Sequence, residues 1–304
     1  MKLIGHLEGN CVANIARLAE CSSRTDFSRV TFNDGLKYSI LHDPLVEVLV
    51  ESPTSFSISE RIDGDLILDG PSISEGRLVD FVLGAKRVKA QHDNLVASSK
   101  ANVNTGWLIV TAYYSAFFAA IEIARLHGYF PMSLASEDTS ALKMKLKGNK
   151  ALVDQFSDSI PRNYVGEVSG NKIIFRSSGD KPHVAAWDQI RKHVLKDIVE
   201  SMGWVEAAIL MWFLSGDRSW QNPSDLRNEW NYKRADLFAR TSRGIQFRKL
   251  IGNADGSQKW LAQAKHADDE NKISILAALA ETLCTPVIQS LERVHRSGIF
   301  ERTF

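Results

Sequence analysis

From about residue 75 to the C-terminus, apolar positions recur at steps of three and four residues, the spacing of amphipathic helices. The clearest predicted helix runs from Gly106 to His127 and stops at Gly128, because glycine readily adopts the left-handed conformation that ends many helices. Further helical tracts are predicted over residues 184–214 and from Glu270 to Arg296. Most of the chain is therefore expected to be helical.

Residues 27–70 have a different pattern, in which short strand-like runs are separated by turn signals. Arg29–Phe32 and Leu36–Leu41 flank Asn33-Asp34-Gly35, a sequence typical of a hairpin turn. This region is expected to form a small antiparallel sheet. Its other predicted strands are Leu45–Val50, Phe56–Ser59 and Leu66–Leu68.

These two patterns predict the fold class, which is α+β. A β-rich N-terminal region, residues 1–72, would carry the small antiparallel sheet, and residues 73–304 would form a mainly α-helical domain. Residues 128–182 are mixed in pattern and include a predicted strand at Asn171–Arg176. We interpret this stretch as an insertion into the helical domain.

Composition narrows the class of protein. Hydrophobic residues make up 44% and charged residues 24% of the 304 positions, which is typical of a folded chain. The 37 basic and 36 acidic residues nearly cancel, which argues against a basic surface for sequence-independent DNA binding. The three cysteines are far apart in the sequence and indicate no disulfide framework.

The N-terminus lacks the long apolar core of a signal peptide. The most apolar stretch, Trp204–Leu214, is about half the length that spans a bilayer. We interpret it as a buried helix and expect a cytoplasmic protein that does not bind membranes.

A helix that opens at Asn222 carries the main candidate for chemistry. Asn222 and Pro223 are a strong N-cap and first-turn pair, and the helix is expected to run to about residue 240. Arg227 and Tyr232 are five residues apart and lie on neighbouring faces, so they converge on one phosphate only if the Arg side chain leans across. The helix N-terminus adds a favourable field for an anion.

A purely structural interpretation of this helix stays open. Arg227 would then pair with a surface acid, a common arrangement, while Leu226 and Trp230 pack inward. Elsewhere, Glu122 lies inside an apolar helical run, where an acid needs a partner or a function. Arg125 is one candidate partner.

Two motifs, in this order, resemble the HEPN superfamily. The first is a helix with Tyr113-Tyr114-x-x-Phe117-Phe118, and the second is a later helix with Leu226-Arg227-Asn228-x-x-x-Tyr232. The resemblance covers roughly residues 78–295. It implies a helical bundle that cleaves RNA without a metal or cofactor, in which the 2′-hydroxyl attacks the adjacent phosphate, Arg stabilises the phosphoryl oxygens and His moves the proton. Family members usually pair their motif helices across a homodimer.

The resemblance assigns roles to particular residues. Arg227 would stabilise the phosphate and Asn228 would orient the Arg or the phosphate, with Asn231 and Tyr232 completing the catalytic site. Tyr232 stands where the family has His. A free phenol ionises at about pH 10, so it is a poor base at neutral pH, although it can donate a proton.

Basic residues follow the motif and are candidates for RNA binding. They are expected to line a groove that tracks phosphates, with the alternative that they form an ordinary solvated helix face. The basic candidates are Lys233, Arg234, Arg240 and Arg243. Aromatic candidates for base stacking are Trp220, Trp230 and Phe247.

Three hypotheses follow. The first is an RNA-directed bacterial protein, a metal-independent ribonuclease or toxin of an anti-phage defence or toxin–antitoxin system, with RNA and possible protein partners. The second is a catalytically inactive HEPN-like subunit that serves dimerisation, scaffolding or partner binding in a defence complex. The third is a DNA-binding accessory protein, which a steep fall of duplex affinity with salt would favour. No phosphate-binding loop or dinucleotide fingerprint is present in the sequence.

Overall fold

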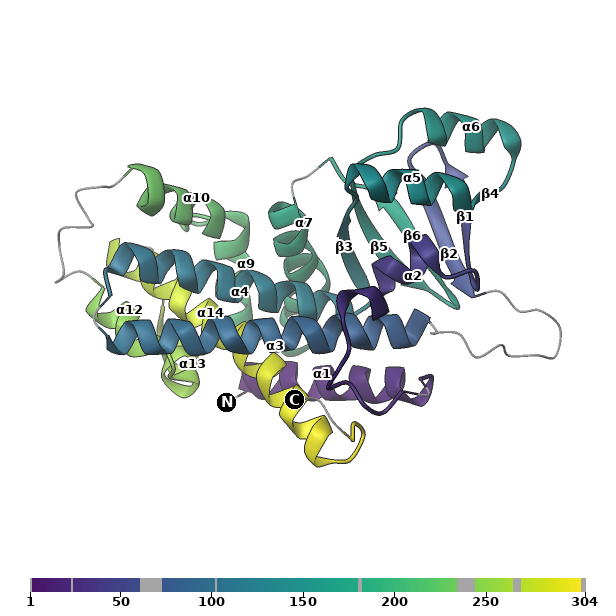
Figure 1. The fold of residues 1–304 in the computed structure, drawn as a ribbon. Coiled ribbons are helices and arrows are strands. Elements are labelled where there is room, and N and C mark those ends of the chain that lie inside the picture. Colours follow the sequence, from purple (N-terminus) through teal and green to yellow (C-terminus); the bar gives the residue numbers. More distant parts are fainter. Residues whose placement is uncertain are drawn as a thin grey trace. The chain divides into compact units, whose positions relative to one another are not determined.

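The computed structural model divides into two compact units, and neither unit is a continuous stretch of the chain (Figure 1). The helical unit comprises Met1–Val12, Gly84–Ile123 and Ala186–Arg293. The sheet unit comprises Ala13–Leu83, Ala124–Ala185 and Val294–Phe304. The structure describes residues 2–22, 24–60, 73–101, 103–179, 182–233, 244–264 and 269–301.

Helices dominate the described chain. The helical periodicity expected from about residue 75 is confirmed by α3, and the predicted helices near 106–127 and 270–296 are confirmed as α4 and α14. The helices are α1 (Lys2–Glu20), α2 (Leu36–His42), α3 (Ile73–Lys100), α4 (Thr105–Leu126), α5 (Ser136–Lys145), α6 (Lys150–Asp158), α7 (Pro182–Gln189), α8 (Lys196–Met202), α9 (Val205–Ser215), α10 (Pro223–Asn228), α12 (Ile245–Leu250), α13 (Ala254–Gln263) and α14 (Asp269–Arg296), with a 3₁₀ turn η1 (Phe32–Asp34) and π turns η2 (Ile190–Leu195) and η3 (Glu229–Lys233).

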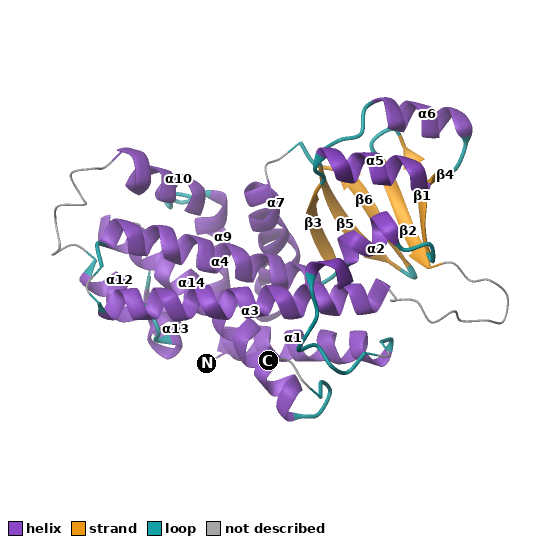
Figure 2. Cartoon of the chain, viewed as in Figure 1, coloured by secondary structure: helices purple, strands orange, loops and turns teal. Residues whose placement is uncertain are grey.

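The strands of the described residues form one six-stranded mixed sheet, in the order β3-β5-β6-β2-β1-β4 (Figure 2). Neighbouring strands are antiparallel, except that β1 and β4 are parallel. The prediction of a small, antiparallel, N-terminal sheet is therefore wrong. The strands are β1 (Val46–Ser52), β2 (Ser55–Glu60), β3 (Tyr129–Ser133), β4 (Leu146–Lys147), β5 (Asn163–Ser169) and β6 (Lys172–Ser177).

The sheet contains strands from across the chain because β2 pairs with β6. Phe56 lies opposite Phe175 in this pair, and the two rings stack with their centroids 5.0 Å apart. Stretches that the sequence predicted separately, Phe56–Ser59 at the N-terminal side and Asn171–Arg176 in the supposed insertion, are thus neighbours in one sheet. Helices α2, α5 and α6 cover one face of this sheet, and their apolar side chains share its core (Figure 1).

The predicted hairpin over residues 29–41 is also wrong, since this segment folds as the turn η1 followed by α2. Its apolar positions fit both structures: alternate residues suggested a strand, whereas Leu36, Ile40 and Leu41 share one helix face and are buried. Asp34 was read as a turn residue. Its carboxylate accepts a hydrogen bond from the backbone N–H of Thr31 at 2.8 Å, a helix-capping contact.

The first helix, α1, was missed altogether. It buries Leu3, Leu7, Cys11 and Ile15, which follow the three- and four-residue spacing of a helix. The predicted strand Leu66–Leu68 lies outside the described residues. The expected β-rich character of residues 1–72 is therefore limited, in the described part, to β1 and β2.

Two described helices, Thr105–Leu126 and Asn271–Arg296, are long and apolar enough to cross a membrane. Their most apolar windows are 67% and 83% buried within the fold, as expected for core helices. The predicted buried helix at 204–214 is confirmed as α9, in which Ile209, Leu210 and Phe213 are buried.

The two edges of the sheet are formed by β3 and β4. Pro131 occupies the middle of β3, and proline has no N–H to donate to a further strand. β4 has only two residues, and they pair with Val48 and Leu49 of β1. Both edges are thus short or interrupted.

Candidate functional site

The candidate site begins at α10, whose N-terminal cap forms as predicted. Asn222 Oδ1 accepts a hydrogen bond from the backbone N–H of Asp225 at 3.0 Å, and Asn222 Nδ2 donates to Asp225 Oδ2 at 2.6 Å. Pro223 occupies the first turn. The cap fixes where the helix begins, and therefore where Arg227 stands on it.

The helix changes from α to π geometry directly after Asn228, at η3. A π turn closes its hydrogen bonds between residues five apart, whereas an α turn closes them between residues four apart. Arg227 and Tyr232 are five apart, so the π turn brings their directions around the axis closer together than a regular α-helix would. Isolated π turns recur at functional sites of helical proteins.

Arg227 is half-buried and hydrogen-bonded to two neutral groups. Nη1 donates to the Tyr114 hydroxyl at 3.1 Å, and Nη2 donates to Asn228 Oδ1 at 2.6 Å. The guanidinium carbon also lies 4.9 Å from the centre of the Tyr113 ring, in cation–π range. Nε is buried and has no hydrogen-bond partner. These contacts orient the guanidinium without placing a carboxylate against its charge.

The support under Arg227 comes from the aromatic side chains of α4. Tyr113 is fully buried, its hydroxyl lies 3.2 Å from Ser224 Oγ, and its ring meets that of Trp187 edge-on at 5.8 Å. The Tyr113 and Tyr114 rings are 5.2 Å apart. The sequence indicated these tyrosines only as core and motif residues. The hydrogen bond between Tyr114 and Arg227 joins positions 113 residues apart and has no local sequence signal.

A shallow depression of about 790 Å³ lies along the motif helix. Tyr232, whose side chain is among the most exposed large ones at 75%, forms part of its wall. Among the described lining residues, two carboxylates face one ammonium group, so the local charge is not positive. The lining residues are Gln221, Asp225, Asn228, Glu229, Tyr232 and Lys233.

The predicted catalytic residues therefore fall into two groups. Asn228 and Tyr232 line the depression, together with the predicted RNA-binding residue Lys233. Arg227 contacts Asn228 but is not among the described lining residues, and neither is Asn231. Asn228 thus connects the guanidinium to the depression.

Three predicted basic residues, Arg234, Arg240 and Arg243, lie outside the described residues. The prediction that aromatic side chains stack on bases is wrong for Trp220, Trp230 and Phe247. They are exposed by only 4%, 6% and 0%, respectively, because they pack into the interior. Tyr232 is the exposed aromatic residue of the site.

Glu122, the acid inside the apolar run of α4, has a partner in the fold. The buried carboxylate of Glu122 accepts a hydrogen bond from Arg87 Nη2 at 3.3 Å, which gives this acid a structural partner. Over the part of the chain that the structure describes, no group of three or more His, Cys, Asp or Glu side chains is arranged to hold a metal ion.

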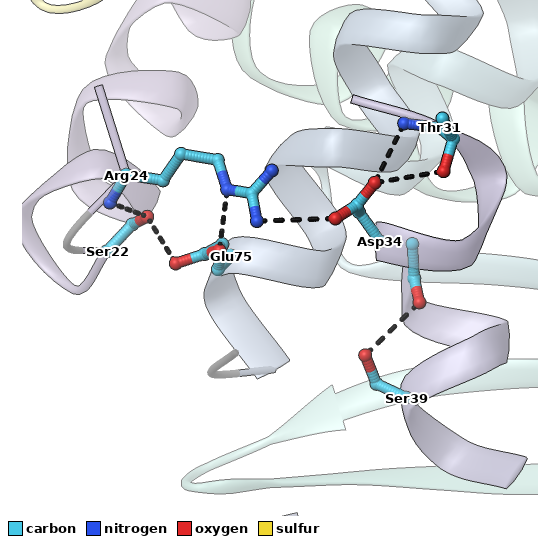
Figure 3. Close-up of polar contacts among 7 residues, drawn as sticks. Ser22, Arg24, Thr31, Asp34, Ser39 and Glu75 are labelled. Carbon is cyan, nitrogen blue, oxygen red and sulfur yellow. Dashed lines mark hydrogen bonds and ion pairs between the residues drawn. The ribbon is translucent and has the colours of Figure 1, made fainter. Parts of the chain in front are cut away.

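A polar cluster in the sheet unit is also internally paired (Figure 3). Arg24 Nε contacts Glu75 at 2.8 Å, and Arg24 Nη2 contacts Asp34 at 3.3 Å. Ser22 donates to Glu75 at 3.4 Å. Because both carboxylates meet the guanidinium, the cluster joins the segment before α2 to the start of α3. We assign it a structural role.

Comparison of the chain with models of protein families, with curated proteins and with solved structures gave no match. The resemblance to the HEPN superfamily accordingly rests on the two sequence motifs, the first carried by α4 and the second by α10 and η3.

Proposed function

We propose that this chain is a HEPN-like, RNA-directed protein in which Arg227 binds a phosphate of RNA. The observation that carries the proposal is the half-buried Arg227, whose buried Nε has no hydrogen-bond partner and whose Nη groups donate to a phenol and an amide. A cation removed from water without a carboxylate partner is costly to bury, and an anionic ligand offsets that cost. Phosphate oxygens suit a guanidinium because they accept two parallel hydrogen bonds.

The reaction that we propose is metal-independent cleavage of RNA in the cytoplasm, as a ribonuclease or toxin of a bacterial defence or toxin–antitoxin system. The 2′-hydroxyl passes its proton to solvent water as it attacks the adjacent phosphorus, the bond to the 5′-oxygen breaks, and a 2′,3′-cyclic phosphate forms; solvent later returns a proton to the Tyr232 side chain. Arg227 stabilises the charge that develops on the phosphoryl oxygens. Tyr232 donates a proton to the departing 5′-oxygen, a role that its exposure permits.

The test is an RNA cleavage assay in the presence of a chelator. We expect wild type to cut RNA and Arg227→Ala to lose at least 10²-fold in rate, about the effect of removing one transition-state donor. Arg176→Ala is the matched control, since Arg176 is an exposed arginine of β6 that pairs with Glu167. Equal cleavage by wild type and Arg227→Ala would refute the proposal.

Replacing Tyr232 tests the proton step separately. Tyr232→His places an imidazole, which titrates near neutral pH, on an exposed position where the fold tolerates it. We expect faster cleavage at pH 7, by about tenfold or more, because a better-matched acid–base group contributes 10²–10⁴-fold in other enzymes. An unchanged or lower rate would argue against a role of this position in proton transfer.

The second candidate function is a catalytically inactive subunit that serves dimerisation, scaffolding or partner binding. It is favoured by the position of Arg227 behind Asn228, outside the lining of the depression, and by the phenol in place of an imidazole. In this case wild type leaves RNA intact under all metal-free conditions, while its mass in solution shows self-association or it assembles with a partner.

A further inference from the structure

Of the two side-chain hydrogen bonds that the Arg227 guanidinium donates, the one to the Tyr114 hydroxyl reaches another helix, α4. Asn228, the other acceptor, is the next residue in the chain and moves with α10. A contact from α4 is therefore needed to fix the guanidinium relative to the body of the helical unit. Without that hydrogen bond, the Arg side chain keeps more of its rotamer freedom, and losing that freedom on binding weakens the affinity for a ligand.

We propose that Tyr114 is a positioning residue for Arg227, which it holds ready for a phosphate; this inference rests on the function proposed above. A guanidinium carries five N–H groups. Nη1 donates one of its N–H groups to Tyr114, and Nη2 donates one of its own to Asn228. Each Nη therefore keeps a second N–H group for a ligand. Holding both Nη groups fixes the plane of the fork, and the plane decides whether an anion can meet two N–H groups at once.

The Tyr113 ring also contacts the guanidinium, through its aromatic face. The guanidinium carbon lies 4.9 Å from the Tyr113 ring centre but 5.9 Å from that of Tyr114. Tyr113 therefore supplies the face on which the guanidinium rests, whereas Tyr114 supplies the hydrogen bond. The hydroxyl of Tyr114 accepts a hydrogen bond from the guanidinium, so we assign Tyr114 a role that acts through Arg227 and not a contact of its own with the ligand.

The experiment uses the full chain and three variants, Tyr114→Phe, Arg227→Ala and Tyr38→Phe. Tyr38 is an exposed tyrosine of α2 in the sheet unit, so Tyr38→Phe removes a hydroxyl far from the motif in sequence and serves as the matched control. Affinity for a single-stranded RNA oligonucleotide is measured across a range of salt concentrations. The guanidinium nitrogens of ¹⁵N-labelled arginine are observed by NMR in parallel, without RNA.

We expect Tyr114→Phe to weaken RNA binding about threefold to tenfold, the effect of one hydrogen bond, with an unchanged dependence of affinity on salt. Arg227→Ala should weaken binding and also reduce the slope of log affinity against log salt concentration by about one, because one phosphate contact is lost. The two variants should therefore differ in the salt dependence of binding, although both bind RNA more weakly than wild type. In the NMR spectra, wild type and Tyr38→Phe should give separate Nη signals for Arg227 that average in Tyr114→Phe.

Averaged Nη signals in wild type, or equal RNA affinity of wild type and Tyr114→Phe, would overturn the inference and leave the proposed function standing. Separate Nη signals together with no RNA binding by wild type would overturn the proposed function, and with it the role assigned to Tyr114.

Discussion

The pKa of the Asp34 carboxyl lies below its ordinary value, chiefly because the backbone N–H of Thr31 donates a hydrogen bond to it. Burial, the second-largest effect, raises the pKa, and the Thr31 hydroxyl and the Arg24 guanidinium lower it further. A lowered pKa means that the ionised form is favoured in the folded state. Asp34 therefore contributes stability at pH values above the pKa of an unfolded Asp, about 3.9.

Asp34→Asn should reveal this contribution. The variant should be less stable than wild type at pH 7 by about 1 kcal/mol, the usual effect of losing a capping carboxylate. As the pH falls below about 3.9 and through the lower folded-state pKa, wild type loses the same contribution, so the difference between the two proteins should shrink toward acid pH. Urea unfolding at pH 7 and pH 3 measures both values, and an equal difference at the two pH values would contradict the assignment.

Among the site residues, sequence reasoning identified those that share a short stretch of helix and missed those that meet through the fold. Arg227 and Asn228 were recognised as a pair, and their hydrogen bond is present. Tyr114 was known only as part of an aromatic motif. Its contact with Arg227 depends on how α4 and α10 pack together, which no local pattern encodes.

At the scale of elements, Gly84 of α3 shows how closely two helices approach. A Cβ atom at this position would lie 2.0 Å from the carboxylate carbon of Glu122 on α4. Glu122 is fully buried and bonded to Arg87, so it cannot move aside without losing that contact. The glycine is therefore required by packing, although glycine is unfavourable inside a helix.

Gly84→Ala should destabilise the protein by about 1–3 kcal/mol, the typical cost of overpacking. Gly9→Ala is the matched control, because Gly9 also lies inside a helix and a Cβ there meets nothing within 4 Å. It should be neutral or stabilise by up to about 1 kcal/mol. Similar effects of both substitutions on chemical unfolding would show that helix propensity, and not the Glu122 contact, determines the outcome.

The elements that were predicted correctly are those with long, unambiguous periodicity. The helices α3, α4 and α14 repeat their apolar positions over many turns, whereas β1 alternates only weakly and, like β2, was recognised as a short apolar run between turn signals. The prediction of a strand for residues 36–41 was wrong because the apolar pattern of these six positions fits both a strand and a helix. The neighbouring carboxylate of Asp34, which stabilises the turn before α2, decided between them.

At the scale of the whole molecule, the sheet could not be predicted, because its pairing is non-local. The strand β2 pairs with β6, more than 100 residues later in the sequence. The resulting sheet unit takes in both the N-terminal strands and the stretch that the sequence suggested was an insertion. Each strand is visible locally, but its partner is selected by the packing of apolar side chains in the shared core.

The proposed ribonuclease site is expected to require two copies of the chain, since the resemblance implies that motif helices pair across a two-fold axis. We therefore expect light scattering to give twice the chain mass of 33.9 kDa. Tyr232→Asp, at an exposed position beside the depression, should shift the mass toward that of one chain, because it would place like charges opposite each other at the axis. A wild-type mass of one chain at all accessible concentrations would contradict a composite cleft.

The proline in the edge strand β3 has a consequence for handling this protein. A sheet that ends in a long, regular strand invites the same strand of a neighbouring molecule to continue it, which is a common route to fibrous aggregates. Here the edge strand β3 lacks a backbone N–H donor at Pro131, and the other edge strand, β4, is only two residues long. Concentrated solutions should therefore resist ordered, amyloid-like growth from this sheet.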